Sequence, residues 1–388
     1  MLALIGGLLH TMSGDPIQGT ILIKDGRIEA IGPNIDIPDG YQVMDISGKV
    51  ATPGLIDAHT HLGVYSESQD WAGEDGNEAS QPITPGMDVL DAIYPDDVGL
   101  ADALGGGVTT AMVAPGSANP IGGQCTIIKT LRQAKVEDMI IRRHAGLKIA
   151  FGENPRRVYG DHKKMPYTRM ATAALIRETF VKAREYIKNK GEKDHKFDLG
   201  LEAVARVLQR EMPLRAHAHR ADDIVTALRI AQEFDVDIIL EHATEGHLIP
   251  EVLAEFKAKA VIGPNLITRS KMELKDKSFT TPAVLAKHGV TFALMSDHPV
   301  LPCAFLPLYA GLAVRFGLSE EHALKAITID AARILGVADR VGSLEAGKDA
   351  DIVVWSDSPL SVTAMPEMVI LNGKVGKIAG EQRVVSWQ

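Results

Sequence analysis

The sequence predicts an α/β protein in which a (β/α)8 barrel, a TIM barrel, carries a small β-sandwich built from both chain ends. Three observations predict this class. The 388 residues suffice for one large domain with a smaller companion. Strand-like runs alternate with helix-like runs through the middle of the chain, which favours a parallel sheet. Both ends carry short strands joined by tight turns instead.

The N-terminal stretch predicts the first strands of the sandwich. The apolar run 1–9 has no basic segment in front of it, so we interpret it as a strand rather than as a signal peptide. The runs 21–23 and 28–32 flank Asp25-Gly26. This dipeptide between two apolar runs is typical of a β-hairpin.

The middle of the chain predicts the barrel, in which helices follow strands. The stretch 66–97, rich in acidic residues, Gly and Pro, is expected to be a long loop. Such loops follow the barrel strands and lie over the catalytic face. Helices are expected at 171–190, 199–210, 221–234, 245–257 and 320–335.

The C-terminal segment predicts the return to the sandwich. Residues 351–355 form a strand-like run, and 368–375 form an expected hairpin around Asn372-Gly373. We therefore expect the sandwich to comprise 1–51 and 341–388 and the barrel to comprise 52–340.

Composition excludes several classes of partner. The formal charge is 41 − 50 = −9, so electrostatics give no support to a nucleic-acid partner. No apolar run is long enough to span a bilayer, and no basic amphipathic segment indicates a membrane surface. Only Cys125 and Cys303 are present, which is consistent with a reducing compartment, and we expect a cytoplasmic protein that acts on a small molecule.

Two histidines at a strand end give the first functional signal. The segment 54–61 reads as a buried strand that ends in His59-Thr60-His61. Because side chains alternate along a strand, His59 and His61 point to the same side. Two imidazoles side by side can bind one metal ion, although two structural histidines at a strand end would give the same pattern.

Further strand-like runs end in potential metal ligands, and this recurrence favours a metal-dependent hydrolase. His217 ends the fifth expected barrel strand, His242 the sixth and Asp297 the eighth. A barrel gathers residues from its strand ends at one face. This donor set suits Zn²⁺, and also Mn²⁺, Fe²⁺ or Co²⁺. Such a metal makes hydroxide available at neutral pH, and Asp297 is then expected to act as general base and acid.

At this point the chain resembles the amidohydrolase superfamily over nearly its whole length. Residues 49–61 resemble the opening strand of that family, 24–28 its first sandwich hairpin, and 341–353 its return to the sandwich. The resemblance implies metal-dependent hydrolysis of a C–N bond in an amide or cyclic amide. It is strongest to the imidazolonepropionase and prolidase-like branches, and it implies a homo-oligomer.

The fourth strand leaves two candidate ligands open. Lys148 resembles the carboxylated lysine that bridges two metals in binuclear relatives. Glu153 in Glu153-Asn154-Pro155 resembles the glutamate of the amino-sugar deacetylases. Its place at the end of the strand favours Glu153, and either residue can instead have a structural role.

Three more residues are candidates near the metal. In the family the first histidine of the fifth-strand pair is the ligand, so His217 is expected to bind metal and His219 to take part in catalysis or to be structural. Arg156 and His298 are expected to bind the substrate. Deamination of a nitrogen heterocycle is the alternative reaction, although His219-Arg220 stands where deaminase relatives carry an acid. A non-catalytic binding or scaffold protein is the alternative from another class.

Overall fold

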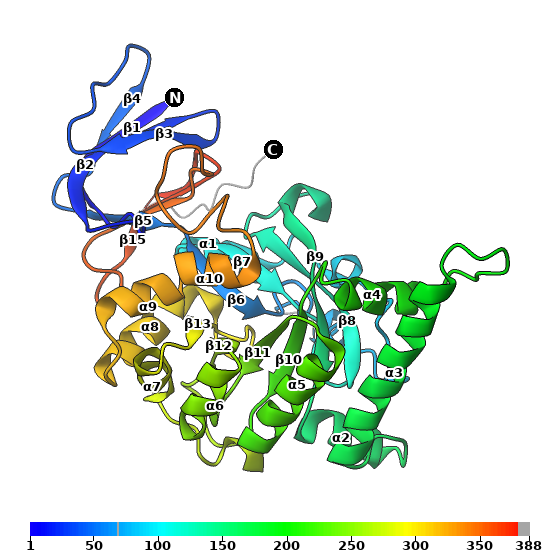
Figure 1. The fold of residues 1–388 in the computed structure, drawn as a ribbon. Coiled ribbons are helices and arrows are strands. Elements are labelled where there is room, and N and C mark those ends of the chain that lie inside the picture. Colours follow the sequence, from blue (N-terminus) through cyan, green and yellow to red (C-terminus); the bar gives the residue numbers. More distant parts are fainter. Residues whose placement is uncertain (68–69, 379–388) are drawn as a thin grey trace.

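Eight strands build a barrel-like sheet in the middle of the chain (Figure 1). The computed structural model describes residues 1–67 and 70–378. Neighbouring strands follow the chain order, and the last strand returns to the first. The strands are β6 (Leu55–Thr60), β7 (Val108–Val113), β8 (Ile121–Lys129), β9 (Ile140–Ala150), β10 (Leu214–Ala218), β11 (Ile238–His242), β12 (Lys259–Ile262) and β13 (Thr291–Leu294). The predicted barrel is confirmed.

Strict strand–helix alternation fails at β8. This strand pairs antiparallel with both β7 and β9, whereas the other barrel pairs are parallel. The physical reason is the length of the connection. Residues 114–120 join β7 to β8, and a parallel crossover needs a dozen residues or more. Only the short helix η3 (Val136–Met139) lies between β8 and β9.

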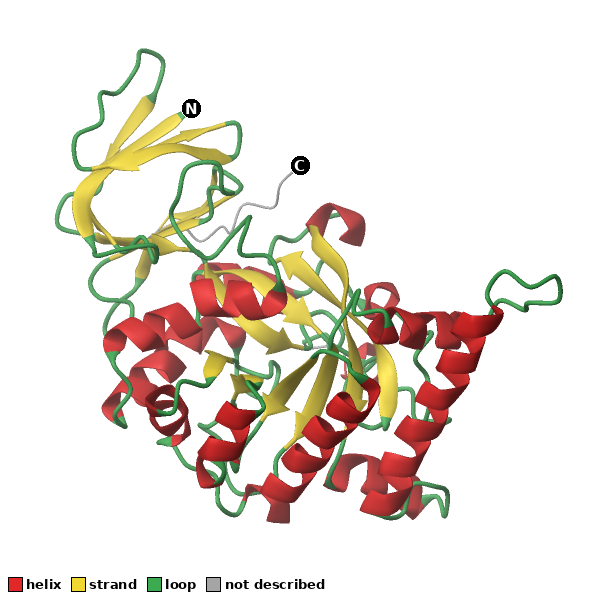
Figure 2. Cartoon of the chain, viewed as in Figure 1, coloured by secondary structure: helices red, strands yellow, loops and turns green. Residues whose placement is uncertain are grey.

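Helices cover the outside of the barrel (Figure 2). Two predicted helices are shorter than expected. The one at 245–257 is reduced to η4 (Gly246–Leu248) and α6 (Pro250–Glu255), and the one at 320–335 is broken at Thr328, whose backbone is not helical. The remaining helices are α1 (Val98–Gly105), α2 (Glu153–Asp161), α3 (Arg169–Asn189), α4 (Leu199–Leu208), α5 (Ala221–Phe234), α7 (Thr281–Lys287), α8 (Leu306–Arg315), α9 (Glu320–Ala326) and α10 (Ile329–Leu335), with short helices η1 (Asp70–Gly73), η2 (Val89–Ala92), η5 (Met272–Leu274) and η6 (Cys303–Phe305).

The two chain ends form a second sheet, as predicted, and its eight strands are joined into one continuous curved sheet (Figure 1). Strand β1 makes this possible because it bends at a bulge at Gly6, where φ is 75°. It pairs with β4 before the bulge and with β5 after it. The strands are β1 (Leu2–Leu9), β2 (Ile17–Lys24), β3 (Arg27–Gly32), β4 (Gln42–Asp45), β5 (Val50–Pro53), β14 (Ile352–Trp355), β15 (Pro366–Leu371) and β16 (Lys374–Ile378).

Both predicted hairpin turns are present. Asp25 and Gly26 have φ values of 49° and 79°, and Asn372 and Gly373 have values of 49° and 74°. Positive φ at both central residues defines the turn that best fits the twist of a hairpin. Among residues 1–67 and 70–378, no helix is long and apolar enough to cross a membrane.

The seam between β13 and β6 brings the last strand to the histidine motif. The Asp297 N–H donates to the His59 carbonyl at 3.3 Å, and the His61 N–H donates to the His298 carbonyl at 2.8 Å. Below them, the Ser296 hydroxyl donates to the Asp57 carboxylate at 2.5 Å. Closure of the barrel therefore places Asp297 beside His59 and His61.

Candidate metal centre

Two groups of potential metal ligands lie at the C-terminal ends of the barrel strands. One comprises His59, His61 and Asp297, and the other His217, His219 and His242; within each group one ligand atom per residue lies within 4.8 Å of the others. The groups adjoin each other, since the ring centroids of His59 and His242 are 5.8 Å apart.

Backbone strain aims two of these side chains into the site. Glu241 points toward His59, so alternation along β11 would turn His242 to the opposite face. His242 instead joins the group because its φ is 69°, and Asp297 likewise has a φ of 57°. Left-handed backbone at residues other than glycine is costly, and such residues concentrate at functional sites.

Backbone carbonyls orient two of the histidines. Nδ1–H of His61 donates to the Ala114 carbonyl at 2.8 Å, and Nδ1–H of His242 donates to the Gly263 carbonyl at 2.9 Å. Each bond leaves Nε2 with its lone pair toward the site, which is the usual arrangement of metal-binding histidines. Burial lowers the pKa of His61, and it lowers the pKa of His242 to about 4, so both rings are neutral.

His217 carries an unsatisfied buried nitrogen. Its Nδ1 has no hydrogen-bond partner among the residues that the structure describes. Burial and the neighbouring histidines hold the pKa of His217 well below the ordinary value, so its ring is neutral. A buried ring nitrogen without a hydrogen-bond partner is a group that a bound metal ion would satisfy. His219 is placed differently, since its Nδ1 lies 2.8 Å from the Thr244 hydroxyl and its Nε2 lies 3.6 Å from Oε1 of Glu273.

Asp297 faces both histidines of the first motif. Its Oδ1 lies 3.3 Å from Nε2 of His59 and 3.3 Å from Nε2 of His61. Burial opposes ionisation of Asp297, but the contacts with these two histidines outweigh it and hold its pKa well below the usual range. The carboxylate is therefore charged at neutral pH.

The two candidates on the fourth strand differ sharply. Lys148 is 1% exposed, and its ammonium makes neither an ion pair nor a hydrogen bond within 1–67 and 70–378. Its charge lowers the pKa of His61, His217 and His242, and burial lowers its own pKa. Glu153 begins α2 outside both groups, and its Oε1 accepts a hydrogen bond from the Glu273 N–H at 3.0 Å.

The two expected substrate-binding residues lie outside both groups. Arg156 on α2 donates from Nε to the Tyr167 carbonyl at 3.3 Å. His298 is 2% exposed and lines a mostly apolar cavity of about 590 Å³ between α1 and η6. Its Nδ1 accepts from the Cys303 N–H at 3.4 Å, and burial lowers its pKa to about 4.

Three charged residues at the site were not predicted from the sequence. Glu241 contacts His59, Arg215 pairs with Glu241, and Glu273 lies beside His219. Charged residues within buried strands, as in Leu240-Glu241-His242, were the available signal for the first two. No signal in the sequence marks Glu273, because it lies in the loop after β12.

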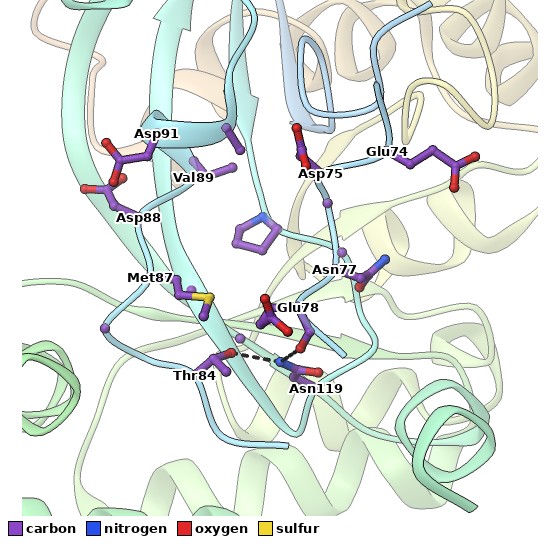
Figure 3. Close-up of a pocket in the computed structure, with 17 residues that line it drawn as sticks. Glu74, Asp75, Asn77, Glu78, Thr84, Met87, Asp88, Val89, Asp91 and Asn119 are labelled. Carbon is purple, nitrogen blue, oxygen red and sulfur yellow. Dashed lines mark hydrogen bonds between the residues drawn. The ribbon is translucent and has the colours of Figure 1, made fainter. Parts of the chain in front are cut away.

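An acidic cavity of about 570 Å³ lies beside this centre (Figure 3). Gly122 separates it from Lys148, since a Cβ at Gly122 would lie 3.6 Å from the Lys148 Cβ. Asn119 fixes part of its wall, because its Nδ2 donates to the Glu78 carbonyl at 2.9 Å and to the Thr84 hydroxyl at 2.8 Å. Five carboxylates also line it, those of Glu74, Asp75, Glu78, Asp88 and Asp91.

The donor set fits a divalent transition metal. It offers buried, neutral imidazoles, an unpaired nitrogen on His217 and an ionised carboxylate on Asp297. Imidazole and carboxylate ligands are those that Zn²⁺ and its neighbours in the first transition row prefer.

The chain is similar to several known proteins. The chain matches the model described as "Amidohydrolase family" over residues 50–376. The crystal structure of an amidohydrolase from Thermotoga maritima MSB8 is 45% identical, with a TM-score of 0.94, and the match covers 97% of this chain and 99% of that one.

Two curated proteins are also similar. Amidohydrolase tasK of Hapsidospora irregularis is 30% identical over 388 residues, which cover 92% of this chain; this chain spans only 39% of that protein. The imidazolonepropionase of Klebsiella pneumoniae (strain 342) is 25% identical over 388 residues, covering 94% of this chain and 92% of the relative.

Proposed function

This chain belongs to the amidohydrolase family, whose members are hydrolases, and on that premise we propose that it hydrolyses a C–N bond in a small-molecule amide or cyclic amide with the aid of a divalent metal. The observation that carries the proposal is the adjacency of the two ligand groups, linked through His59 and His242 at the strand ends. Zn²⁺ suits these donors best, and Mn²⁺, Fe²⁺ and Co²⁺ are the other candidates.

The residues that would hold the metal come from four strands or strand ends. His59, His61 and Asp297 supply one group, and His217 and His242 supply the other. A divalent metal in such a site polarises a carbonyl oxygen and lowers the pKa of water.

Lys148 is the preferred ligand from the fourth strand. Its burial, its unpaired ammonium and its influence on both histidine groups support this choice over Glu153. A lysine whose pKa is lowered is more often neutral, and the neutral Nζ can add CO₂ to form an anionic carbamate with release of a proton. The carboxylate of Glu153 is occupied by the Glu273 N–H instead.

Asp297 is the proposed carrier of the proton. Its ionised carboxylate takes a proton from the attacking water and returns it to the leaving nitrogen, as general base and then general acid. His219 lies beside the metal-binding histidines, 4.7 Å from the His217 ring and 4.5 Å from the His242 ring, and is proposed to contact the reacting group. Arg156 and His298 remain the proposed substrate contacts.

Deamination is the second candidate reaction, and one observation favours it. Glu273 is fully buried, and its Oε1 lies 3.6 Å from Nε2 of His219. The fifth barrel strand of this chain carries no acid beside His219, and the loop after β12 supplies Glu273 there instead. An acid there is the group that a deaminase needs to protonate its leaving ammonia.

A substrate panel tests the proposal. The purified protein is stripped with a chelator, reloaded with Zn²⁺ and assayed against N-acyl amines, cyclic amides such as hydantoins, and aminated heterocycles. We expect amide hydrolysis that is lost on stripping and restored by Zn²⁺, and ammonia release from the heterocycles would favour deamination. Failure to bind any divalent metal would contradict the proposal and favour a binding or scaffold protein.

A further inference from the structure

A charged pair is buried in the barrel next to the proposed metal ligands. Arg215 of β10 and Glu241 of β11 are both 0% exposed, and Nε of Arg215 forms an ion pair with Oε1 of Glu241. Arg215 lies on the same face of β10 as His217, two residues along the strand. Arg215 therefore points to the same side of the sheet as His217, one layer of side chains further down the barrel.

The second oxygen of Glu241 faces a metal-binding histidine. Oε2 of Glu241 lies 2.9 Å from Nδ1 of His59, while Nε2 of His59 faces Asp297 at 3.3 Å. Nη2 of Arg215 donates to the carbonyl of Ala58, the residue before His59, at 2.7 Å. Arg215 and Glu241 thus contact both the ring of His59 and the backbone that carries it.

The barrel makes room for this pair. Gly146 on the neighbouring strand β9 faces the stem of Arg215, and a Cβ there would overlap Cγ of Arg215. Such a pair brings no clear gain in stability, because desolvating two ions costs several kcal/mol and apolar residues of similar size are often as stable. Stability alone therefore does not explain the arrangement.

We propose that Glu241 is a positioning residue, which accepts a hydrogen bond from Nδ1–H of His59 so that Nε2 is presented to the metal, and that the ion pair with Arg215 holds the Glu241 carboxylate at this place. Nδ1 of His61 and Nδ1 of His242 donate to backbone carbonyls, whereas Nδ1 of His59, alone of these three, faces a carboxylate oxygen. A charged acceptor makes the imidazole a stronger donor to a metal than a neutral one does. The inference rests on the proposed function, since it concerns the metal held by His59.

Substitutions at this pair give the test. Glu241→Gln keeps the size of the side chain and removes its charge, and we expect the dissociation constant for Zn²⁺ to rise about 10- to 100-fold. The affinity is measured by competition with a chromophoric chelator on the folded protein. The visible absorption of the Co²⁺-loaded variant should also shift, because the donor strength of one ligand has changed.

A double variant separates positioning from stability. Glu241→Gln alone leaves Arg215 unpaired, so this variant will also unfold more easily. Arg215→Met/Glu241→Gln leaves no unpaired charge, and we expect it to recover stability while its Zn²⁺ affinity stays low. Because the double variant lacks the buried charge, it also provides the test if the single variant does not fold.

Asp351→Asn is the control for the loss of a buried carboxylate charge away from the site. Asp351 forms a buried ion pair with Lys129, their side chains being 3% and 5% exposed, and it contacts none of the histidines. This variant should lose stability and keep the affinity of the wild type. Unchanged Zn²⁺ affinity and Co²⁺ spectrum in both Glu241 variants would overturn the inference and leave the proposed function standing, whereas absence of metal from the wild type would overturn both.

Discussion

Glu153 and Glu273 hold each other by reciprocal hydrogen bonds. The N–H of Glu153 donates to Oε2 of Glu273 at 2.9 Å, and the N–H of Glu273 donates to Oε1 of Glu153 at 3.0 Å. The two bonds form a clamp between the start of α2 and the loop after β12, beside His219. In this clamp, the Glu153 carboxylate, which the sequence favoured as a metal ligand, accepts a hydrogen bond from the backbone instead.

Glu153→Ala is therefore expected to weaken the fold without removing metal. Loss of its hydrogen bond should lower the free energy of unfolding by roughly 1–2 kcal/mol, because the buried Glu273 N–H loses its acceptor. Lys148→Ala should lower the metal content instead. Urea unfolding and elemental analysis of the two variants check this, and loss of metal from Glu153→Ala alone would reverse the assignment.

Gly152 shapes the same clamp. Its φ is 81°, and a Cβ at this position would lie 2.5 Å from Oε2 of Glu273. Gly152→Ala should destabilise the protein by about 1–3 kcal/mol, from backbone strain and the collision together. Gly347→Ala controls for strain alone, since Gly347 has a φ of 90° and no atom near the added Cβ. Equal losses in the two variants would mean that the contact with Glu273 contributes nothing.

Asp297→Asn should abolish most of the activity. The amide cannot accept and return a proton, so we expect kcat to fall about 10²- to 10⁴-fold. Because Asp297 is also a proposed ligand, kcat is to be expressed per bound metal ion. The control is Asp330→Asn on α10, where the carboxylate pairs with Arg333, and this variant should keep the kcat of the wild type. Full turnover by metal-loaded Asp297→Asn would exclude the proton transfer.

The metal-free protein should lose stability in mild acid. Burial lowers the pKa of His242 from its ordinary 6.5 to about 4. Between pH 6.5 and 4, His242 is therefore protonated in the unfolded chain but not in the folded chain. The free energy of unfolding should therefore fall between pH 6.5 and 4, by up to about 3 kcal/mol for this group. The difference between wild type and His242→Gln, measured in urea at several pH values, isolates the effect. A difference that does not change with pH would contradict it.

The sequence predicted much of the architecture because its signals are local. Alternation along β6 paired His59 with His61, and the dipeptides at Gly26 and Gly373 defined hairpins that the structure contains. Asp297 was found because a strand-like run ends beside it. These features depend on a few neighbouring residues, which a single sequence displays.

What the sequence did not show depends on contacts between distant segments. The antiparallel direction of β8 follows from a short connection, and the inward turn of His242 follows from its left-handed backbone. Glu241 and Glu273 gain their roles only through His59 and His219, which lie on other strands. No local pattern distinguishes such acids from ordinary charged residues.

The most direct test of the account is the number of metal ions per chain in the purified, Zn²⁺-loaded protein. We predict about two ions per chain, one for each ligand group. The metal content should be lower in His59→Ala and in His217→Ala. Wild-type protein that takes up no divalent metal under any loading condition would contradict the metal centre and the hydrolytic function proposed for it.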